Sequence, residues 1–275
     1  MNCKITGKGL ELSKAIILGL VQGLTEFLPV SSSGHLVLVS ELLSFHGQGV
    51  AFNVCVHLGT LFAVVLAFRT EFVAMFLAPL RFVGGNRDTE VRHSLLWLFY
   101  IFIATLPVAV VGLGCIEHIE KFFRSTSLTL VLLSVTGIMM IAVRFIAEGE
   151  KPLSWKASLI IGCAQAVAVL PGISRSGATI FAALLVGIPR QRAARFSFLL
   201  SVPAILGAAV LQIREFLATP PDAGAVSILL TGALVSAVSG YLAIRLLLEV
   251  VRKNRLHWFG YYCLLLAGLG LVLYS

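Results

Sequence analysis

Charged residues are scarce in this chain. Only 12% of its 275 residues are Asp, Glu, Lys or Arg, whereas 58% are hydrophobic and the mean hydropathy is +0.97. A typical soluble domain is about 25% charged, so this composition excludes a soluble protein and indicates a polytopic membrane protein. The net charge of +8 could suggest a nucleic-acid partner. We expect none, because the Lys and Arg residues cluster between apolar runs, as the positive-inside rule predicts.

Several catalytic motifs are also missing. The chain has no P-loop, no GxSxG elbow, no HExxH and no CxxC pair, which argues against ATP-driven, α/β-hydrolase and zinc-protease chemistry. Its five cysteines stand singly at positions 3, 55, 115, 163 and 263. We interpret them as small buried hydrophobic residues rather than as disulfide partners or metal ligands.

Long hydrophobic runs are what the chain has instead. A spanning helix takes about 20 apolar residues. Two stretches, roughly 12–45 and 157–188, are interrupted by a Pro-Ser-Gly cluster, and each half is too short to span comfortably. We expect re-entrant helix–loop–helix hairpins there, since irregular backbone at membrane depth must line a polar cavity; a kinked spanning helix is the alternative. Six uninterrupted stretches predict transmembrane helices in an all-α membrane protein, at roughly 51–68, 93–115, 127–147, 196–213, 225–247 and 258–274.

Loop charges predict the orientation. With six spans and two hairpins, 14 basic residues fall on one side and 6 on the other. The richer side is expected to be cytoplasmic, which places both termini outside and makes the hairpins enter from opposite faces. That is an inverted-topology repeat, with one polytopic domain over 1–275, repeat 1 at about 1–147 and repeat 2 at about 156–275. The poorer side carries Lys4, Lys8, Lys14, Lys121, Arg124 and Arg214.

The two interrupted stretches carry one motif written twice, over 22–35 and 165–177. Each copy has Leu-Pro followed by Ser-x-Ser-Gly, with one more residue before the first Ser in the second copy. Charged groups at membrane depth are costly and are functional candidates, which singles out Glu26 and Arg175. Paired broken segments in two halves of a chain point to a central site at their interface.

The first copy begins with an amide and a carboxylate on one helix face. Gln22 and Glu26 are four residues apart. Together they can hold a hard divalent cation with help from water and substrate phosphate. Glu26 can instead serve as a general base, and the plain alternative is a buried Glu satisfied by hydroxyl groups.

Polar residues then surround the break. Ser31, Ser32, Ser33 and Gly34 follow Pro29 and would begin the next half-helix, whose free N–H groups suit an anion such as phosphate. The alternative is an N-cap, for which one Ser suffices. His35 can share a face with Ser31 and act as base, acid or nucleophile, or be structural.

The second copy supplies the guanidinium. Arg175 stands between Ser174 and Ser176, and its planar donors suit phosphate oxygens. Its anionic partner would be a ligand phosphate or Glu26, so a purely structural ion pair with Glu26 is the main alternative. His57 stands alone in a predicted span, and we interpret it as a satisfied core histidine. Small residues at 232–240 suit close helix contact, within the chain or in a dimer.

At these motifs the chain closely resembles the integral-membrane undecaprenyl pyrophosphate phosphatase family of the bacitracin-resistance type. The family's first signature, [Glu/Gln]-x-x-x-Glu followed by Leu-Pro-Val-Ser-Ser-x-Gly-His, stands at 22–35. Its second, Pro-Gly-x-Ser-Arg-Ser-Gly-Ala-Thr, stands at 171–179. Gln22 occupies a position where many members have Glu. This weakens any mechanism that needs two carboxylates and makes the chemistry depend more on Glu26.

The resemblance implies hydrolysis of undecaprenyl pyrophosphate with a divalent cation, Mg²⁺ or Ca²⁺, and with it bacitracin resistance. It implies a bacterial inner-membrane enzyme and allows a homodimer. Loop charge alone predicts that the site opens to the extracytoplasmic side. The catalytic residues would be Glu26, Ser32, His35 and Arg175, with Ser32 or an activated water as nucleophile. The rival class is a transporter of a lipid phosphate or another anion. Phosphate binding would fall to Ser31, Ser33, Gly34, Ser174, Ser176, Gly177 and Thr179.

Overall fold

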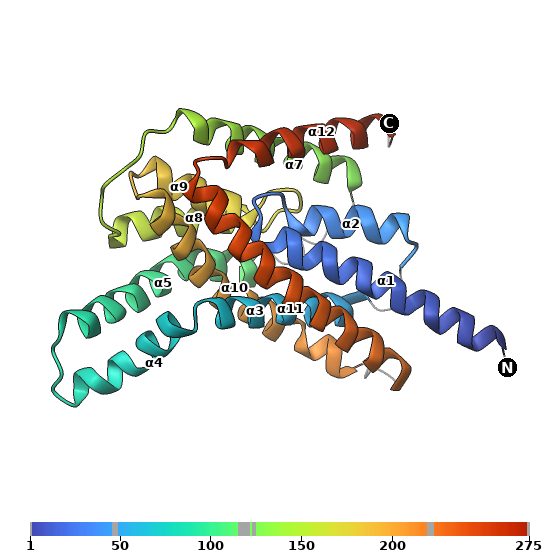
Figure 1. Ribbon diagram of the computed structural model, residues 1–275, viewed down its shortest axis with the longest axis horizontal. Coiled ribbons are helices and arrows are strands. Elements are labelled where there is room, and N and C mark those ends of the chain that lie inside the picture. The colour runs from blue at the N-terminus through green and yellow to red at the C-terminus, as the bar shows by residue number, and fades with distance from the viewer. Residues whose placement is uncertain (1, 46–48, 115–121, 123–124, 219–222, 274–275) are drawn as a thin grey trace.

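The computed structural model describes residues 2–45, 49–114, 122, 125–218 and 223–273, and within these ranges every regular element is a helix. Figure 1 shows them as one bundle in which the chain termini lie toward the same end. The helices are α1 (Asn2–Phe27), α2 (Ser32–Leu42), α3 (Gly49–Ala67), α4 (Arg69–Val83), α5 (Thr89–Gly114), α7 (Thr126–Ala142), the short 3₁₀ turn η1 (Val143–Phe145), α8 (Trp155–Val167), α9 (Arg175–Leu185), α10 (Arg190–Ala218), α11 (Ala223–Arg252) and α12 (His257–Leu273).

Five of the described helical segments are long and apolar enough to cross a membrane. They are Val50–Ala67, Thr89–Gly114, Thr126–Phe145, Arg190–Gln212 and Ala225–Arg252. Each coincides with a predicted span, which confirms an all-helical membrane protein. The sixth predicted span corresponds to α12, which is equally apolar but has only 17 residues.

Two elements differ from the sequence expectation. The region after the first predicted span was expected to be a connection, yet residues 69–83 form α4, which packs on α5. Met75 and Ala78 are buried on one face of α4, because apolar residues recur there at helical spacing. The first half-helix also begins earlier than residue 12, at Asn2, since the polar residues before the apolar run include no proline to stop it.

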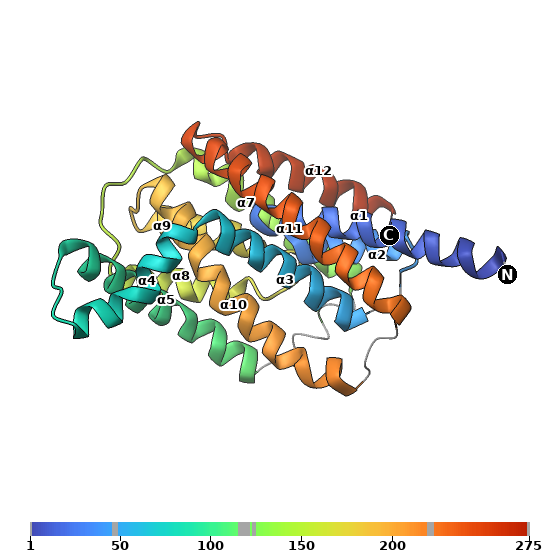
Figure 2. The same ribbon diagram turned by 60° about the horizontal axis from the view of Figure 1, so that its bottom comes forward.

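Both predicted interruptions are present. Helix α1 ends at Phe27, before Pro29, and α2 begins at Ser32; α8 ends at Val167, before Pro171, and α9 begins at Arg175. Proline removes a backbone donor and disfavours helix at the residue before it, so each break follows from local sequence. The two breaks meet near the middle of the bundle, between the α1–α2 and α8–α9 pairs (Figures 1 and 2).

Helix α11 fixes α1 and α3 through the predicted small-residue face, so this contact lies within the chain. A side chain at Gly23 of α1 would place its Cβ 2.0 Å from the hydroxyl oxygen of Ser239. A side chain at Gly59 of α3 would lie 2.2 Å from the carbonyl oxygen of Ala233. Only glycine permits these approaches, and they set the position of the last turns of α1 that carry Gln22 and Glu26.

The described cysteines are less buried than the sequence predicts. Cys55, Cys163 and Cys263 are free, but only Cys263 is buried; Cys163 is exposed and Cys55 half-buried, because apolar helices of a membrane protein also turn small residues outward. Cys115, Lys121 and Arg124 lie outside the described residues, as do the side chains of Cys3, Lys4, Lys8 and Arg214.

Candidate active site

The candidate site lies where the two breaks meet. Glu26 stands in the last turn of α1, and Arg175 is the first residue of α9. Nη2 of Arg175 lies 2.5 Å from Oε1 of Glu26, and the two side chains are only 15% and 6% exposed. The acid of one motif copy and the guanidinium of the other therefore form a buried pair across 149 residues of sequence.

Three further groups lie around Oε2, the second carboxylate oxygen of Glu26. Ser32 donates its hydroxyl proton to Oε2 at 2.6 Å, and Gln22 donates from Nε2 at 3.0 Å. Nε2 of His57 on α3 lies 3.8 Å from the same oxygen. One carboxylate thus binds groups from α1, α2 and α9 and faces a fourth from α3. A serine hydroxyl held on a carboxylate is the arrangement in which a general base activates a nucleophile.

The first serine of each motif caps a helix. The hydroxyl oxygen of Ser31 accepts from the amide of Gly34 at 3.4 Å, and that of Ser174 accepts from the amide of Gly177 at 3.1 Å. Each cap hydroxyl also pairs with the Ser two residues later, at 3.3 Å in the first copy and 3.2 Å in the second. The capping alternative is therefore realised at these two positions, while Ser32 is left free to bind Glu26.

Contacts from neighbouring elements pin the second break. Ser176 donates to the carbonyl oxygen of Leu28 at 3.2 Å, which ties this break directly to the first. Thr136 of α7 donates to the carbonyl oxygen of Gly172 at 2.8 Å and accepts from the amide of Ser174 at 3.0 Å. Gly172 has φ 98°, a conformation that favours glycine. Thr136 was not anticipated, because a lone Thr in an apolar span carries no signal of its partner.

Thr179 is placed one turn further into α9. Its hydroxyl group bonds to the carbonyl oxygens of Arg175 and Ser176, at 2.9 and 3.2 Å, and pairs with the hydroxyl of Ser197 on α10 at 2.7 Å. The side chain is fully buried. In this position Thr179 joins α9 to α10 and orients the helix that begins with Arg175.

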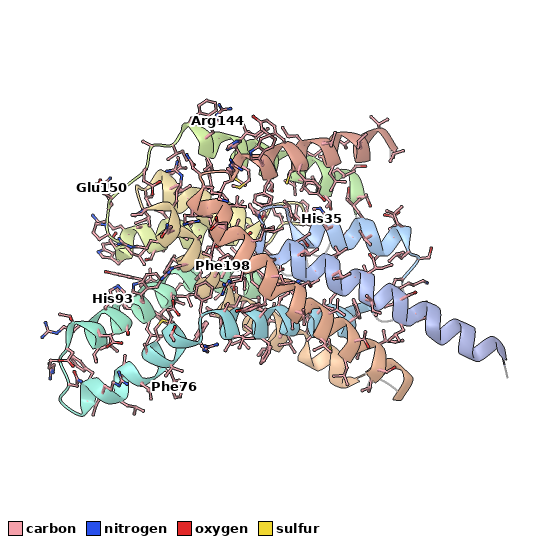
Figure 3. All side chains as sticks on the ribbon, viewed as in Figure 1. His35, Phe76, His93, Arg144, Glu150 and Phe198 are labelled. Atoms are coloured by element: carbon pink, nitrogen blue, oxygen red, sulfur yellow. The ribbon has the colours of Figure 1, made fainter. Side chains whose placement is uncertain are left out.

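His35 is buried and held on both sides. Nδ1 lies 2.8 Å from the carbonyl oxygen of Ser31, and Nε2 lies 2.7 Å from the hydroxyl of Tyr262 on α12. The two rings are nearly parallel, with centroids 5.6 Å apart. Figure 3 shows His35 at the centre of the bundle. Both ring nitrogens are therefore hydrogen-bonded. Tyr262 contacts the site, although no sequence motif around it predicts this contact.

Some polar atoms of the motifs have no hydrogen-bond partner within the part of the chain that the structure describes. Oε1 of Gln22, Nη1 of Arg175 and both amide atoms of Gln165 are buried without a hydrogen-bond partner among the described residues. Buried polar groups are rarely left unpaired, so the unpaired atoms of Gln22 and Arg175, which both contact Glu26, indicate a ligand-binding centre. An ion pair with a purely structural role would not need them.

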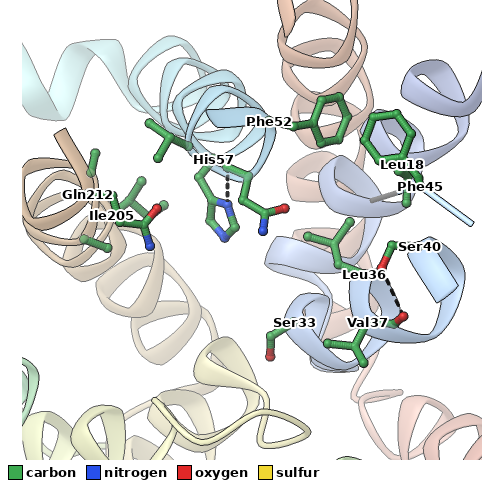
Figure 4. Close-up of a pocket in the computed structure, with 14 residues that line it drawn as sticks. Leu18, Ser33, Leu36, Val37, Ser40, Phe45, Phe52, His57, Ile205 and Gln212 are labelled. Carbon is green, nitrogen blue, oxygen red and sulfur yellow. Dashed lines mark hydrogen bonds between the residues drawn. The ribbon is translucent and has the colours of Figure 1, made fainter. Parts of the chain in front are cut away.

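A cavity of about 460 Å³ opens beside this centre, between α1–α2, α3 and α10 (Figure 4). Its polar lining includes Ser33, Asn53 and His57, and its apolar lining includes Phe45 and Phe52. The expectation that His57 is a satisfied core residue is wrong. Its side chain is 34% exposed and its Nε2 faces Glu26, while Nδ1 donates to the carbonyl oxygen of Asn53 at 2.7 Å. A mixed apolar and polar cavity of this size suits an amphipathic ligand.

Comparison with known proteins covers the same residues. The family model described as "Bacitracin resistance protein BacA" matches residues 15–269, which include both breaks. A protein of Korarchaeum cryptofilum named undecaprenyl-diphosphatase is 41% identical over 260 residues, covering 93% of this chain and 97% of that protein. Proteins of the same name from Methanobrevibacter smithii and Desulfatibacillum aliphaticivorans are 42% and 40% identical, covering 92% and 94% of this chain and 94% and 97% of their own lengths.

Proposed function

The chain belongs to the bacitracin resistance protein BacA family, and from that premise we propose that it is an undecaprenyl-diphosphatase. It hydrolyses undecaprenyl diphosphate to undecaprenyl phosphate and inorganic phosphate, as the names of its relatives indicate. This recycles the lipid carrier for cell-wall synthesis and confers bacitracin resistance by removing the diphosphate that bacitracin binds. The observation that carries the assignment to this chain's own residues is the serine–carboxylate–guanidinium cluster of Ser32, Glu26 and Arg175.

In the proposed reaction, Oγ of Ser32 attacks the terminal phosphorus. Its proton passes to Glu26 along the 2.6 Å hydrogen bond, and the bond from this phosphorus to the bridging oxygen breaks. The bridging oxygen leaves with the electron pair as part of undecaprenyl phosphate. Water then attacks the phosphoserine, releasing inorganic phosphate and restoring the hydroxyl group. Arg175 would bind the transferring phosphoryl oxygens through Nη1, the atom that has no partner among the described residues.

Attack by a water molecule is the alternative to attack by Ser32. Both ring nitrogens of His35 are hydrogen-bonded, which leaves Glu26 as the better placed base for either nucleophile. A phosphoserine trapped by rapid quench favours Ser32. Single-turnover hydrolysis in H₂¹⁸O, with label entering phosphate and no intermediate, favours water.

The phosphate-binding set follows from the same geometry. Ser33 lines the cavity, and the first turns of α2 and α9 offer amide groups that helices leave unpaired. Ser31, Ser174, Gly34 and Gly177 would act through the caps that shape these turns. Ser176 and Thr179 would act by holding the second break in place.

Gln22 and Glu26 would hold a divalent cation. Oε1 of Gln22 is a buried acceptor that no donor in the described ranges satisfies, which fits a cation ligand. The described residues contain no cluster of three or more His, Cys, Asp or Glu side chains, so substrate oxygens and water would complete the coordination. When bound, the cation would neutralise diphosphate charge.

We further propose a multi-pass arrangement with α12 as a sixth span and the two helix–break–helix pairs as re-entrant hairpins of an inverted repeat. Support comes from loop charge, because Arg144, Arg190 and Arg252 line one polar cavity. Arg252 is the last residue of α11, which in Figure 1 runs toward the end opposite the termini. That end would be cytoplasmic in the inner membrane, and the active site would open outside. Single cysteines at Ser125 and Lys253 should react with impermeant reagent from opposite sides; reaction from one side at both positions contradicts this topology.

Phosphate release in detergent micelles tests the function. Wild-type protein should release phosphate from undecaprenyl diphosphate, whereas a pure lipid-phosphate transporter would release none because a micelle has no two sides. Arg175→Ala should lower the rate by about 10²-fold or more while the protein stays folded. The matched control is Arg195→Ala, since Arg195 pairs with Glu71 on the exposed surface at 3.7 Å. Full activity of Arg175→Ala contradicts the assigned site.

A further inference from the structure

The Ser31–Ser32 peptide is held in an unusual conformation at the start of α2. Ser31 has φ 67° and ψ 94°, a sparsely populated region for a residue other than glycine. Such a conformation persists only where surrounding contacts hold it. The carbonyl oxygen of Ser31 accepts two hydrogen bonds from His35, one from the amide at 3.2 Å and one from Nδ1 at 2.8 Å. His35 therefore holds, through two hydrogen bonds, the peptide group that directly precedes Ser32.

The ring of His35 has one proton arrangement that satisfies its neighbours in the neutral form. A carbonyl oxygen can only accept, so Nδ1 carries the proton that it donates to Ser31. Nε2 is then a lone pair, and it accepts the hydroxyl proton of Tyr262 at 2.7 Å. With both nitrogens used, the imidazole is fixed in tautomer and in orientation.

Tyr262 is 45% exposed, and its position is set by the close packing of the helix that carries it. Helix α12 packs closely on α7, where a Cβ added to Gly260 would lie 2.6 Å from the carbonyl oxygen of Gly137. The next residue, Cys263, is fully buried and its Sγ lies 3.9 Å from the carbonyl oxygen of Pro29 in the first break. The packing of α12 thus positions the hydroxyl of Tyr262 at the ring of His35, a residue 227 positions away in the sequence.

We infer that Tyr262 is a positioning residue for the phosphoryl transfer, acting through His35. Its hydroxyl orients the imidazole, the imidazole holds the Ser31–Ser32 peptide, and this peptide keeps Oγ of Ser32 within 2.6 Å of Glu26. This inference rests on the proposed function. It assigns His35 to the geometry of the nucleophile rather than to proton transfer.

The first test compares two neighbouring tyrosines. Tyr262→Phe keeps the stacked ring and removes only the hydroxyl. Tyr261→Phe makes the same change at a neighbour of equal exposure, 44% against 45%, whose ring contacts are with His257 and Trp258 instead of His35. With undecaprenyl diphosphate in micelles, Tyr262→Phe should lower kcat about tenfold and change KM less than about twofold, since small misplacements of a reacting group cost up to about 10²-fold. Tyr261→Phe should match the wild type.

A second set of variants separates positioning from general folding. If Tyr262 acts through His35, the double variant His35→Ala/Tyr262→Phe should be no slower than His35→Ala alone. A tyrosine that only stabilises the fold would slow both backgrounds equally. Such independent losses overturn the inference.

A spectroscopic readout does not depend on turnover. In ¹⁵N-histidine-labelled protein, the His35 signals, assigned with His35→Asn, should show a neutral ring protonated at Nδ1. Tyr262→Phe should shift the Nε2 signal, and Tyr261→Phe should leave it unchanged. The positioning role alone is overturned if the Nε2 signal of His35 does not shift in Tyr262→Phe. It is also overturned if the wild type is active and Tyr262→Phe has the same kcat. An inactive wild type overturns the proposed function, and the positioning role with it.

Discussion

Replacing Glu26 by Gln separates the roles of this carboxylate, because the change keeps its shape and removes its charge. In the wild type the side chain accepts hydrogen bonds from Ser32, Gln22 and Arg175. The amide is a poor base for the Ser32 proton. It also leaves the guanidinium of Arg175, which is only 15% exposed, without a countercharge.

The two losses have separate magnitudes. Removal of a general base costs about 10²–10⁴-fold in rate, or about 3–5 kcal/mol of activation free energy at ~1.4 kcal/mol per tenfold. Breaking a buried ion pair by removing one partner costs about 3–5 kcal/mol of folding free energy. The variant should therefore combine a kcat lowered by about 10²-fold or more with a lower free energy of unfolding.

The assay is phosphate release in micelles at saturating substrate, with thermal unfolding measured on the same preparation. Glu71→Gln is the matched control, since Glu71 pairs with Arg195 on the surface, and exposed pairs contribute about 0–1 kcal/mol. Retention of more than about a tenth of the wild-type kcat by Glu26→Gln would refute its role as the base. An unchanged Tm of Glu26→Gln would refute the stabilising role of the buried ion pair.

The remaining predictions concern the break geometry and the nucleophile. Gly172→Ala should lower Tm by about 6 °C or more, since its Cβ would lie 2.2 Å from a backbone carbonyl oxygen at φ 98°; Gly112→Ala, with nothing within 4 Å, should not. Thr136→Val should destabilise by about 2–4 kcal/mol because two buried backbone groups lose their partner, whereas Thr105→Val removes only a bond within its own helix. Ser32→Ala should abolish phosphoserine formation; an intermediate that persists in this variant contradicts the assignment of the nucleophile.

The local features of this site could be read from the residues because they depend on neighbours in sequence. Proline at 29 and 171 stops a helix whatever packs around it, and Ser before Gly then supplies a cap. Glu26 and Arg175 stood out because a charge in an apolar run is costly. Five spanning segments were equally readable, since burial in lipid requires long apolar helices.

Other members of the site could not be found this way. His57, Thr136 and Tyr262 are single polar or aromatic residues in apolar helices, where the same residue types commonly serve packing. Their roles depend on partners in other helices, as Tyr262 and His35 are 227 residues apart. Helix α4 was missed for a different reason: its apolar residues recur at helical spacing, but the segment has only 15 residues and includes Arg69, Glu71 and Arg81, so it does not resemble a membrane span.

By itself, the sequence determined the class of protein, the positions of the two helix breaks and the acid, guanidinium and serines that they carry. Only the tertiary structure decided that these groups share one centre, that His35 is bonded on both nitrogens, and that His57 faces Glu26. The division has a physical cause: hydropathy and helix termination act within a few residues, whereas distances between side chains on different helices are set by the close packing of α1, α3, α7, α11 and α12.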